Sequence, residues 1–282
     1  MASSYRLFLY FLREMSKITE KFDHIRSEGR KGFIPFVTAG DPDLSTSLSI
    51  VLKLAELGAD IIELGVPFSD PMADGPTIQR SSQRALNNGT NLAQVLHLAS
   101  MVRQRSDVPL VLFSYFNPIL RFGLDDFQMA ASLSGIDGVL LTDVIEDEAA
   151  KISEKFAAAD IDLITLIAPT TTDERLKTIC GLARGFIYAV SRAGVTGARE
   201  STSDAAETLV SRARHFTDMP IAVGFGISTP AQISDVWKYA DAAVVGSAIV
   251  SVIESSDGGQ STVSNVEEFV QKLLPDRRPP AS

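Results

Sequence analysis

Hydrophobic residues along this chain gather into eight short, nearly continuous runs that are separated by longer amphipathic stretches. The runs do not alternate apolar with polar positions, which is typical of parallel strands covered on both sides. We predict strands over Phe33–Thr38, Asp60–Leu64, Leu110–Tyr115, Gly138–Thr142, Asp162–Ile167, Phe186–Val190, Ile221–Gly224 and Ala242–Gly246. Helical spacing between them predicts helices over Ser45–Leu57, Leu92–Arg105, Glu146–Ala158, Thr172–Leu182, Ser203–Thr217 and Pro230–Tyr239.

Strands that alternate with helices from end to end predict a (β/α)8 barrel, the TIM barrel fold, as a single domain over residues 16–274. An additional helix over Lys17–Ser27 precedes the first strand, and we expect it to cover the N-terminal end of the barrel. Ser45 and Ser203 are candidate N-caps, and Thr229 followed by Pro230 is a further helix start. A doubly wound open sheet is the alternative, but no GxGxxG motif follows the first strand.

Both ends of the chain differ from the barrel in composition. We predict that residues 1–15 are a disordered extension and that residues 275–282, which are rich in proline, are a disordered tail. The apolar run Leu7–Leu12 is too short to span a membrane, although a cryptic targeting segment remains an alternative. The polar segment Glu254–Asn265 is predicted to be a loop before a last helix at Val266–Leu274.

Charge and cysteine content exclude several classes of function. A net charge of -9 disfavours binding to nucleic acid, and no basic stripe is found along the sequence. A single cysteine, Cys180, cannot form a disulfide framework and fits the reducing cytoplasm, where we expect the protein to act. No histidine, cysteine and carboxylate set has the spacing of metal ligands, so we predict no metal site.

Candidate catalytic residues are those at the C-terminal ends of the strands, where barrels of this kind carry their active sites. Glu63 interrupts the second buried strand, and an ionised carboxylate there costs several kcal/mol unless it has a partner or a chemical role. Burial should raise its pKa toward neutrality, as suits a group that both takes and gives a proton; a rim ion pair with an arginine is the alternative. Asp74 follows in the loop Ser69–Gln79, where an Asx turn or a helix cap is equally compatible.

Glycine-rich turns follow the last three predicted strands, at Ser191–Gly197, Gly224–Ser228 and Gly246–Ser247. Such loops hold phosphate groups through backbone N–H groups and a helix N-terminus, which suits an acidic protein. Tyr188, near the end of the sixth strand, either reaches the mouth of the barrel or belongs to the core. Lysines avoid the strand ends, so the sequence offers no nucleophile for a Schiff base.

Two motifs are similar to those of the tryptophan synthase alpha subunit family. They are Ile-Glu-Leu-Gly-Val-Pro-Phe-Ser-Asp-Pro-Met-Ala-Asp-Gly-Pro-Thr-Ile-Gln, which ends at Gln79, and Gly-Phe-Ile-Pro-Phe-Val-Thr-Ala-Gly-Asp-Pro, which begins at Gly32. The similarity extends from about Lys17 to Leu274. It implies a (β/α)8 lyase that cleaves indole-3-glycerol phosphate into indole and glyceraldehyde 3-phosphate for tryptophan biosynthesis.

The resemblance also implies roles for individual residues. Glu63 would be the acid–base group, Asp74 would bind the indole N–H, and Tyr188 would lie at the mouth of the site. Thr196 would belong to the loop that closes on the substrate. The late loops would bind the substrate and its phosphate, at Thr196, Gly197, Phe225, Gly226, Gly246 and Ser247. No cofactor is expected in this chain, and pyridoxal phosphate would belong to a beta subunit in an α2β2 assembly.

Two segments depart from the family pattern, in regions that the family uses for beta contact. A proline-containing turn is common after Asp143, where this chain has Val144-Ile145-Glu146-Asp147, and Arg80-Ser81-Ser82 after Gln79 is also unusual. The altered turn after Asp143 motivates one alternative, a free-standing lyase that is active without a beta subunit. The other alternative is a catalytically silent activating partner, which would have no reason to keep both Glu63 and Asp74.

Overall fold

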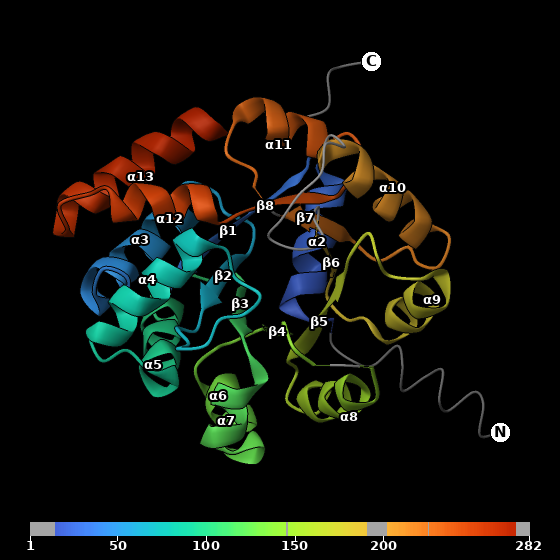
Figure 1. The fold of residues 1–282 in the computed structure, drawn as a ribbon, viewed down its shortest axis with the longest axis horizontal. Coiled ribbons are helices and arrows are strands. Elements are labelled where there is room, and N and C mark those ends of the chain that lie inside the picture. The colour runs from blue at the N-terminus through green and yellow to red at the C-terminus, as the bar shows by residue number, and fades with distance from the viewer. Residues whose placement is uncertain (1–14, 145, 191–201, 225, 275–282) are drawn as a thin grey trace.

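Eight parallel strands close into a barrel in the computed structural model, which describes residues 15–144, 146–190, 202–224 and 226–274 (Figure 1). Each strand pairs with the next along the chain, and β8 closes the ring on β1 with Gly32 opposite Ala242. The strands are β1 (Gly32–Thr38), β2 (Ile62–Gly65), β3 (Leu110–Ser114), β4 (Gly138–Leu141), β5 (Asp162–Ile167), β6 (Ile187–Val190), β7 (Ile221–Gly224) and β8 (Ala242–Val245). The predicted (β/α)8 barrel is confirmed.

Helices surround the barrel and cover the outer face of every strand (Figure 1). Their apolar faces and the outward side chains of the strands form one large buried core. The helices are α2 (Lys17–Ser27), α3 (Leu44–Glu56), α4 (Pro76–Asn87), α5 (Leu92–Arg103), α6 (Phe116–Phe122), α7 (Leu124–Leu133), α8 (Glu146–Ala157), α9 (Asp173–Leu182), α10 (Thr202–Arg214), α11 (Pro230–Val236), α12 (Ser247–Glu254) and α13 (Gly259–Leu273).

Several helix boundaries differ from the prediction. The segment Glu254–Asn265 is not one loop, because α13 begins at Gly259 and includes the predicted Val266–Leu274 helix. Helix α3 is capped by Asp43, whose side chain accepts the Thr46 N–H at 2.9 Å, so Ser45 lies inside the helix. Ser203 lies within α10, while Thr229 caps α11 as predicted.

Helix α2 fills the N-terminal end of the barrel, as expected. Ile18, Phe22 and Ile25 are buried against inward side chains of the strands, and the Phe22 and Phe186 rings lie 5.6 Å apart. The Ser16 side chain, which caps α2, also donates to Asp162 at the start of β5. Because α2 closes this end, a substrate reaches the barrel interior from the C-terminal ends of the strands.

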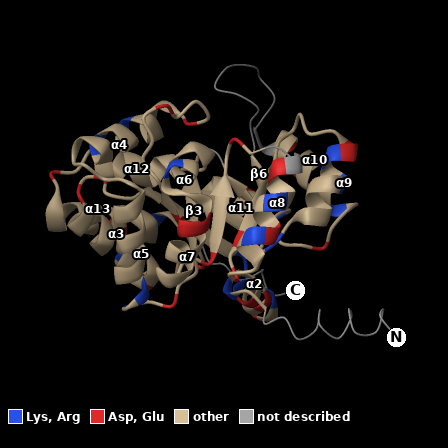
Figure 2. Cartoon of the chain, turned by 90° about the horizontal axis from the view of Figure 1, so that it is seen from below, with Lys and Arg blue, Asp and Glu red and all other residues tan. Residues whose placement is uncertain are grey.

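Figure 2 shows that positions of Lys and Arg and positions of Asp and Glu are interspersed along the helices. Within the described ranges, no helix is long and apolar enough to cross a membrane. Apart from Met15, the predicted extension over residues 1–15 and the predicted tail over residues 275–282 lie outside the described residues.

Candidate functional site

A cavity of about 270 Å³ opens at the C-terminal ends of the strands and brings together six residues that the sequence predicted. They come from strands or loops that are far apart in the chain: β2, the loop after it, β6, the loop after β7 and the start of α12. The six are Glu63, Asp74, Tyr188, Gly226, Gly246 and Ser247. The structure therefore places a candidate acid–base pair and candidate anion-binding loops around one space.

Glu63 points into the barrel from β2. It shares a face with Ile61, which belongs to the interior cluster, whereas Ile62 and Leu64 pack outward against the helices. Its side chain is almost fully buried, and its Oε1 atom has no hydrogen-bond partner among the described residues. Burial raises the pKa of Glu63 to about 8. Among the described residues, Glu63 forms no ion pair with an arginine, which was the alternative interpretation.

Asp74 lies across the cavity in the loop that connects β2 to α4. Its N–H donates to the Pro71 carbonyl at 3.1 Å, and the next residue, Gly75, is the N-cap of α4 without a side-chain cap. The Asp74 carboxylate is thus not used as the helix cap and remains in the lining of the cavity. Burial raises its pKa to about 6, and a hydrogen bond from Tyr115 opposes the rise.

Tyr188 is buried at the inner wall of the cavity, on β6. Burial, reinforced by the charge of Glu63, raises its pKa well above that of an ordinary tyrosine, so the phenol stays protonated. Its hydroxyl passes closely over the backbone of Gly224 on β7. A Cβ atom on Gly224 would lie 2.1 Å from the Tyr188 oxygen, so only glycine permits this arrangement.

The far wall of the cavity is aromatic. Phe36 and Phe113 face inward from β1 and β3 and meet edge to face, with ring centroids 5.3 Å apart. Adjacent Gly65 makes room for Phe36, whose ring atoms lie as close as 2.5 Å to where a Cβ would be. Sequence reasoning missed both phenylalanines. Side chains alternate between the two faces of a strand, and this alternation places both residues on the face that points into the barrel.

The N-terminus of α12 lies at the cavity, where Gly246 and Ser247 are among the lining residues. No side chain of the described residues caps this end, so its N–H groups and the helix dipole are available to an anion. Gly226, after β7, has a φ of 77°, which a glycine adopts without strain. Thr196, Gly197 and Phe225, the other predicted phosphate-binding residues, lie outside the described residues.

A profile of the family described as "Tryptophan synthase alpha chain" matches residues 22–276. This chain belongs to the tryptophan synthase alpha chain family. It is 46% identical over 246 residues to the tryptophan synthase alpha chain of Citrifermentans bemidjiense, covering 87% of this chain and 92% of the relative. The corresponding protein of Solibacter usitatus is 45% identical over 92% of this chain and 97% of its own length.

Solved structures of the family superpose on nearly the whole barrel. A chain of tryptophan synthase from Mycobacterium tuberculosis has a TM-score of 0.85 and 35% sequence identity. The match covers 94% of this chain and 100% of the Mycobacterium tuberculosis chain. Tryptophan synthase subunit alpha from Legionella pneumophila gives a TM-score of 0.84 at 31% identity, covering 92% of this chain and 97% of its own.

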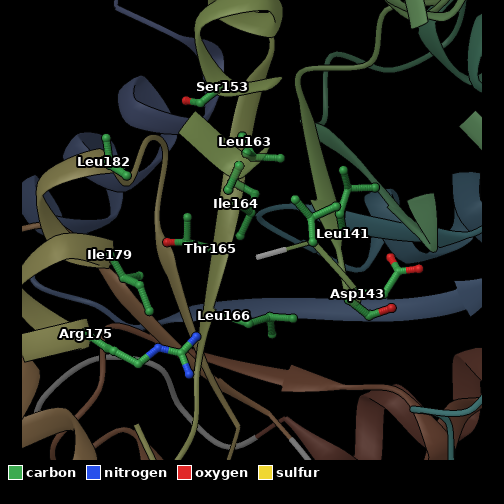
Figure 3. A pocket seen from close by; sticks show the side chains of 13 residues that line it. Leu141, Asp143, Ser153, Leu163, Ile164, Thr165, Leu166, Arg175, Ile179 and Leu182 are labelled. Atoms are coloured by element: carbon green, nitrogen blue, oxygen red, sulfur yellow. The ribbon is translucent and has the colours of Figure 1, made fainter. Parts of the chain in front are cut away.

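A second cavity, of about 300 Å³, lies where β4 and β5 separate and α8 and α9 cover them. Figure 3 shows Leu141 and Asp143 on one side of it and Ile179, Leu182 and Arg175 on the other. None of the predicted catalytic or phosphate-binding residues that the structure describes lines this cavity. It adjoins the turn after Asp143 that departs from the family pattern, and Ile145 in that turn is outside the described residues.

Proposed function

We propose that this chain is the alpha subunit of a tryptophan synthase and cleaves indole-3-glycerol phosphate into indole and glyceraldehyde 3-phosphate. One observation carries the proposal: the buried Glu63 carboxyl group, whose Oε1 has no partner among the described residues, shares an aromatic-walled cavity with Asp74. Such a cavity fits the indole ring, and the α12 N-terminus at its edge fits the phosphate.

The reaction requires a proton to be added to one carbon and another to be removed from a hydroxyl group. With a pKa of about 8, Glu63 is protonated at neutral pH and donates its proton to C3 of the indole ring. Asp74 accepts a hydrogen bond from the indole N–H and so stabilises the positive charge that develops on the ring. The bond between C3 and the glycerol chain then breaks, and the Glu63 carboxylate takes the proton of the hydroxyl that becomes the aldehyde. Glu63 ends protonated, as it began.

Binding of the phosphate relies on neutral donors in this proposal. The backbone N–H groups at Gly246 and Ser247 act with the turn at Gly226, and no lysine or arginine is among the residues lining the described cavity. By resemblance, Thr196, Gly197 and Phe225 belong to the same phosphate-binding set. Tyr188 positions the substrate from the inner wall through its protonated hydroxyl.

The chain needs no cofactor for this chemistry, since each proton transfer is assigned to Glu63. We propose a beta subunit as its partner, in an α2β2 assembly within the cytoplasm, and expect pyridoxal phosphate only in that partner. Membership of the alpha chain family supports this partner, as does the similarity to a chain of a Mycobacterium tuberculosis tryptophan synthase.

The test is indole release from indole-3-glycerol phosphate by the purified protein, measured alone and after addition of a tryptophan synthase beta subunit. Slow release that rises sharply with the beta subunit is the expected result. Fast release that the beta subunit does not change would indicate a free-standing lyase. No release under either condition would contradict the proposed activity and leave only an activating partner.

A further inference from the structure

We propose that Tyr115 is a positioning residue, which holds the loop after β2 and aims the Asp74 carboxylate at the substrate. The inference deepens the proposed function and rests on it. Tyr115 was not singled out by the sequence, and it lies outside the set of residues that line the cavity.

Tyr115 is buried and is fixed by contacts of its backbone and its ring. It directly follows β3 and is the N-cap residue of α6, and only 6% of it is exposed. The Ser114 hydroxyl donates to the Tyr115 carbonyl at 2.8 Å, and the N–H of Phe116 donates to Asp143 Oδ1 at 2.8 Å. Its ring packs on Phe68, with centroids 5.1 Å apart. A side chain fixed in this way can hold another group in position.

The Tyr115 hydroxyl acts on two consecutive residues of the loop. It accepts the N–H of Ala73 at 2.8 Å, and its interaction with the Asp74 carboxylate opposes the rise in the pKa of Asp74 that burial causes. One hydroxyl thus anchors the backbone of the loop beside the side chain that the proposed reaction uses. The two contacts are compatible, since a phenol offers one donor and two acceptor positions.

The loop's other hydrogen bonds do not reach the barrel. Within the described residues, those of residues 70–75 run inside the loop or to Gln79 in α4, as when Gln79 Nε2 donates to the Asp74 carbonyl at 2.9 Å. Met72, at the tip, is 83% exposed. Tyr115 is therefore the described hydrogen-bonding contact that ties this loop to the end of a strand.

The groups around Asp74 include no cation that could pair with its carboxylate in the described lining of the cavity. The ionisable groups that face Asp74 and Tyr115 are Glu63 on β2, Tyr188 on β6 and Asp143 after β4, all of them acidic. The described lining of the cavity contains no lysine, arginine or histidine. The Tyr115 hydroxyl supplies a donor to a carboxylate that has no cation in this lining.

The test is Tyr115→Phe, assayed for indole formation with the beta subunit present. The variant keeps the ring contact with Phe68 and loses only the hydroxyl. We expect kcat to fall about 10-fold with KM changed less than about threefold, as for a lost hydrogen bond to a charged group. Losing a donor to the carboxylate raises the pKa of Asp74, so the acid limb of the pH–rate profile should move upward by about one pH unit.

Tyr239→Phe is the matched control. Like Tyr115, Tyr239 lies near two carboxylates, Glu207 and Asp235, but it is half-buried and lies away from the cavity. Its loss of a hydroxyl should leave kcat and the acid limb unchanged. An unchanged acid limb in Tyr115→Phe would overturn the inference. A fall in kcat without that change would indicate only a general loss of packing, which does not alter the pKa of Asp74.

Asp74→Asn separates the inference from the proposed function. If Asp74→Asn turns over like the wild type, the proposed role of Asp74 fails. If Asp74→Asn is slow and Tyr115→Phe behaves like the wild type, only the positioning role fails. The double variant supports the inference if it is no slower than Asp74→Asn alone, and contradicts it if the two losses multiply.

Discussion

Glu63 and Asp74 differ in how deeply they are buried, and this separates the pH ranges in which they ionise. The pKa of Glu63 is raised to about 8 and that of Asp74 to about 6, in both cases chiefly by burial. Between these values Glu63 is protonated and Asp74 is ionised, which is the pair of states that the proposed reaction requires. Two carboxyl groups in one cavity thereby take opposite roles.

A bell-shaped dependence of kcat/KM on pH follows from this separation. Activity should fall below a pH of about 6, as Asp74 takes up a proton, and above a pH of about 8, as Glu63 loses its proton. Rates measured across this range test the assignment, and Asp74→Asn should lose the acid limb. An acid limb that persists in Asp74→Asn would show that another group controls it.

The close approach of Tyr188 to Gly224 predicts a strong effect of one methyl group. In Gly224→Ala the new Cβ would collide with the Tyr188 hydroxyl, at 2.1 Å, and push the ring into the cavity. Displacement of a group at the site by about 1 Å can reduce the rate roughly 100-fold. Gly181→Ala in α9 is the control, because open space surrounds Gly181, and its activity should match the wild type. Equal activity of both variants would contradict the packing described.

At the residue level, the sequence identified groups that stand out within their own segment. Glu63 could be predicted because a charge interrupts an apolar strand, and the structure places it inside the barrel. Tyr115 could not, because its partners Ala73 and Asp74 belong to a loop that only the tertiary fold brings to the end of β3. Its sequence pattern is that of any aromatic residue at a strand end.

At the level of elements, strands β1, β3 and β7 are tied at their N-terminal ends by carboxylates from the segment that leads into the next strand. Asp60 accepts the Phe33 N–H at 2.9 Å, Asp137 accepts the Leu110 N–H at 2.9 Å, and Asp241 accepts the Ile221 N–H at 2.7 Å. Each also pairs with an arginine; these are Arg30, Arg103 and Arg214. The bonds lie at the barrel end opposite the cavity, where they stabilise the fold without contacting the substrate.

Asp137→Ala should therefore lower stability and leave catalysis intact. The substitution removes the partner of the Leu110 N–H and of Arg103, whose side chain is only 18% exposed. The expected loss is about 2–4 kcal/mol in the free energy of unfolding. Asp125→Ala, at an 87% exposed carboxylate paired with Lys155, should leave unfolding unchanged. Chemical denaturation measures both, and a loss in kcat for Asp137→Ala would contradict the separation of roles.

Helices were predicted well where apolar side chains mark their buried face and poorly elsewhere. Helix α4 escaped notice because Ser81, Ser82 and Ala85 form its buried face, and the Ser81 hydroxyl meets Thr38 at 2.6 Å. Small polar residues hide a core position when a hydrogen bond satisfies them. The sequence predicts a loop over the first part of α13 because this helix begins at a glycine, Gly259, although Val263 and Val266 are buried at helical spacing.

At the level of the whole molecule, helices α4 and α12 both begin at the cavity, and ion pairs farther along the two helices connect them. Gly75 and Pro76 at the start of α4, and Ser247 at the start of α12, line the cavity. Farther along, Arg80 and Arg84 of α4 both bind Glu254 at the end of α12, at 2.7 and 2.8 Å. These contacts keep the Asp74 loop and the proposed phosphate site in one rigid frame.

The measurement that tests the central claim most directly is the rate of indole formation by Glu63→Gln, compared with Asp74→Asn at saturating beta subunit. Glutamine fills the same space but cannot exchange the proton, and general acid–base catalysis contributes about 10²–10⁴-fold. Asp74→Asn removes one hydrogen bond to a charged group, worth roughly 10–150-fold. We predict a larger loss of kcat for Glu63→Gln, with substrate affinity largely kept. Equal and small losses in the two variants would contradict the assignment of Glu63 as the acid–base group.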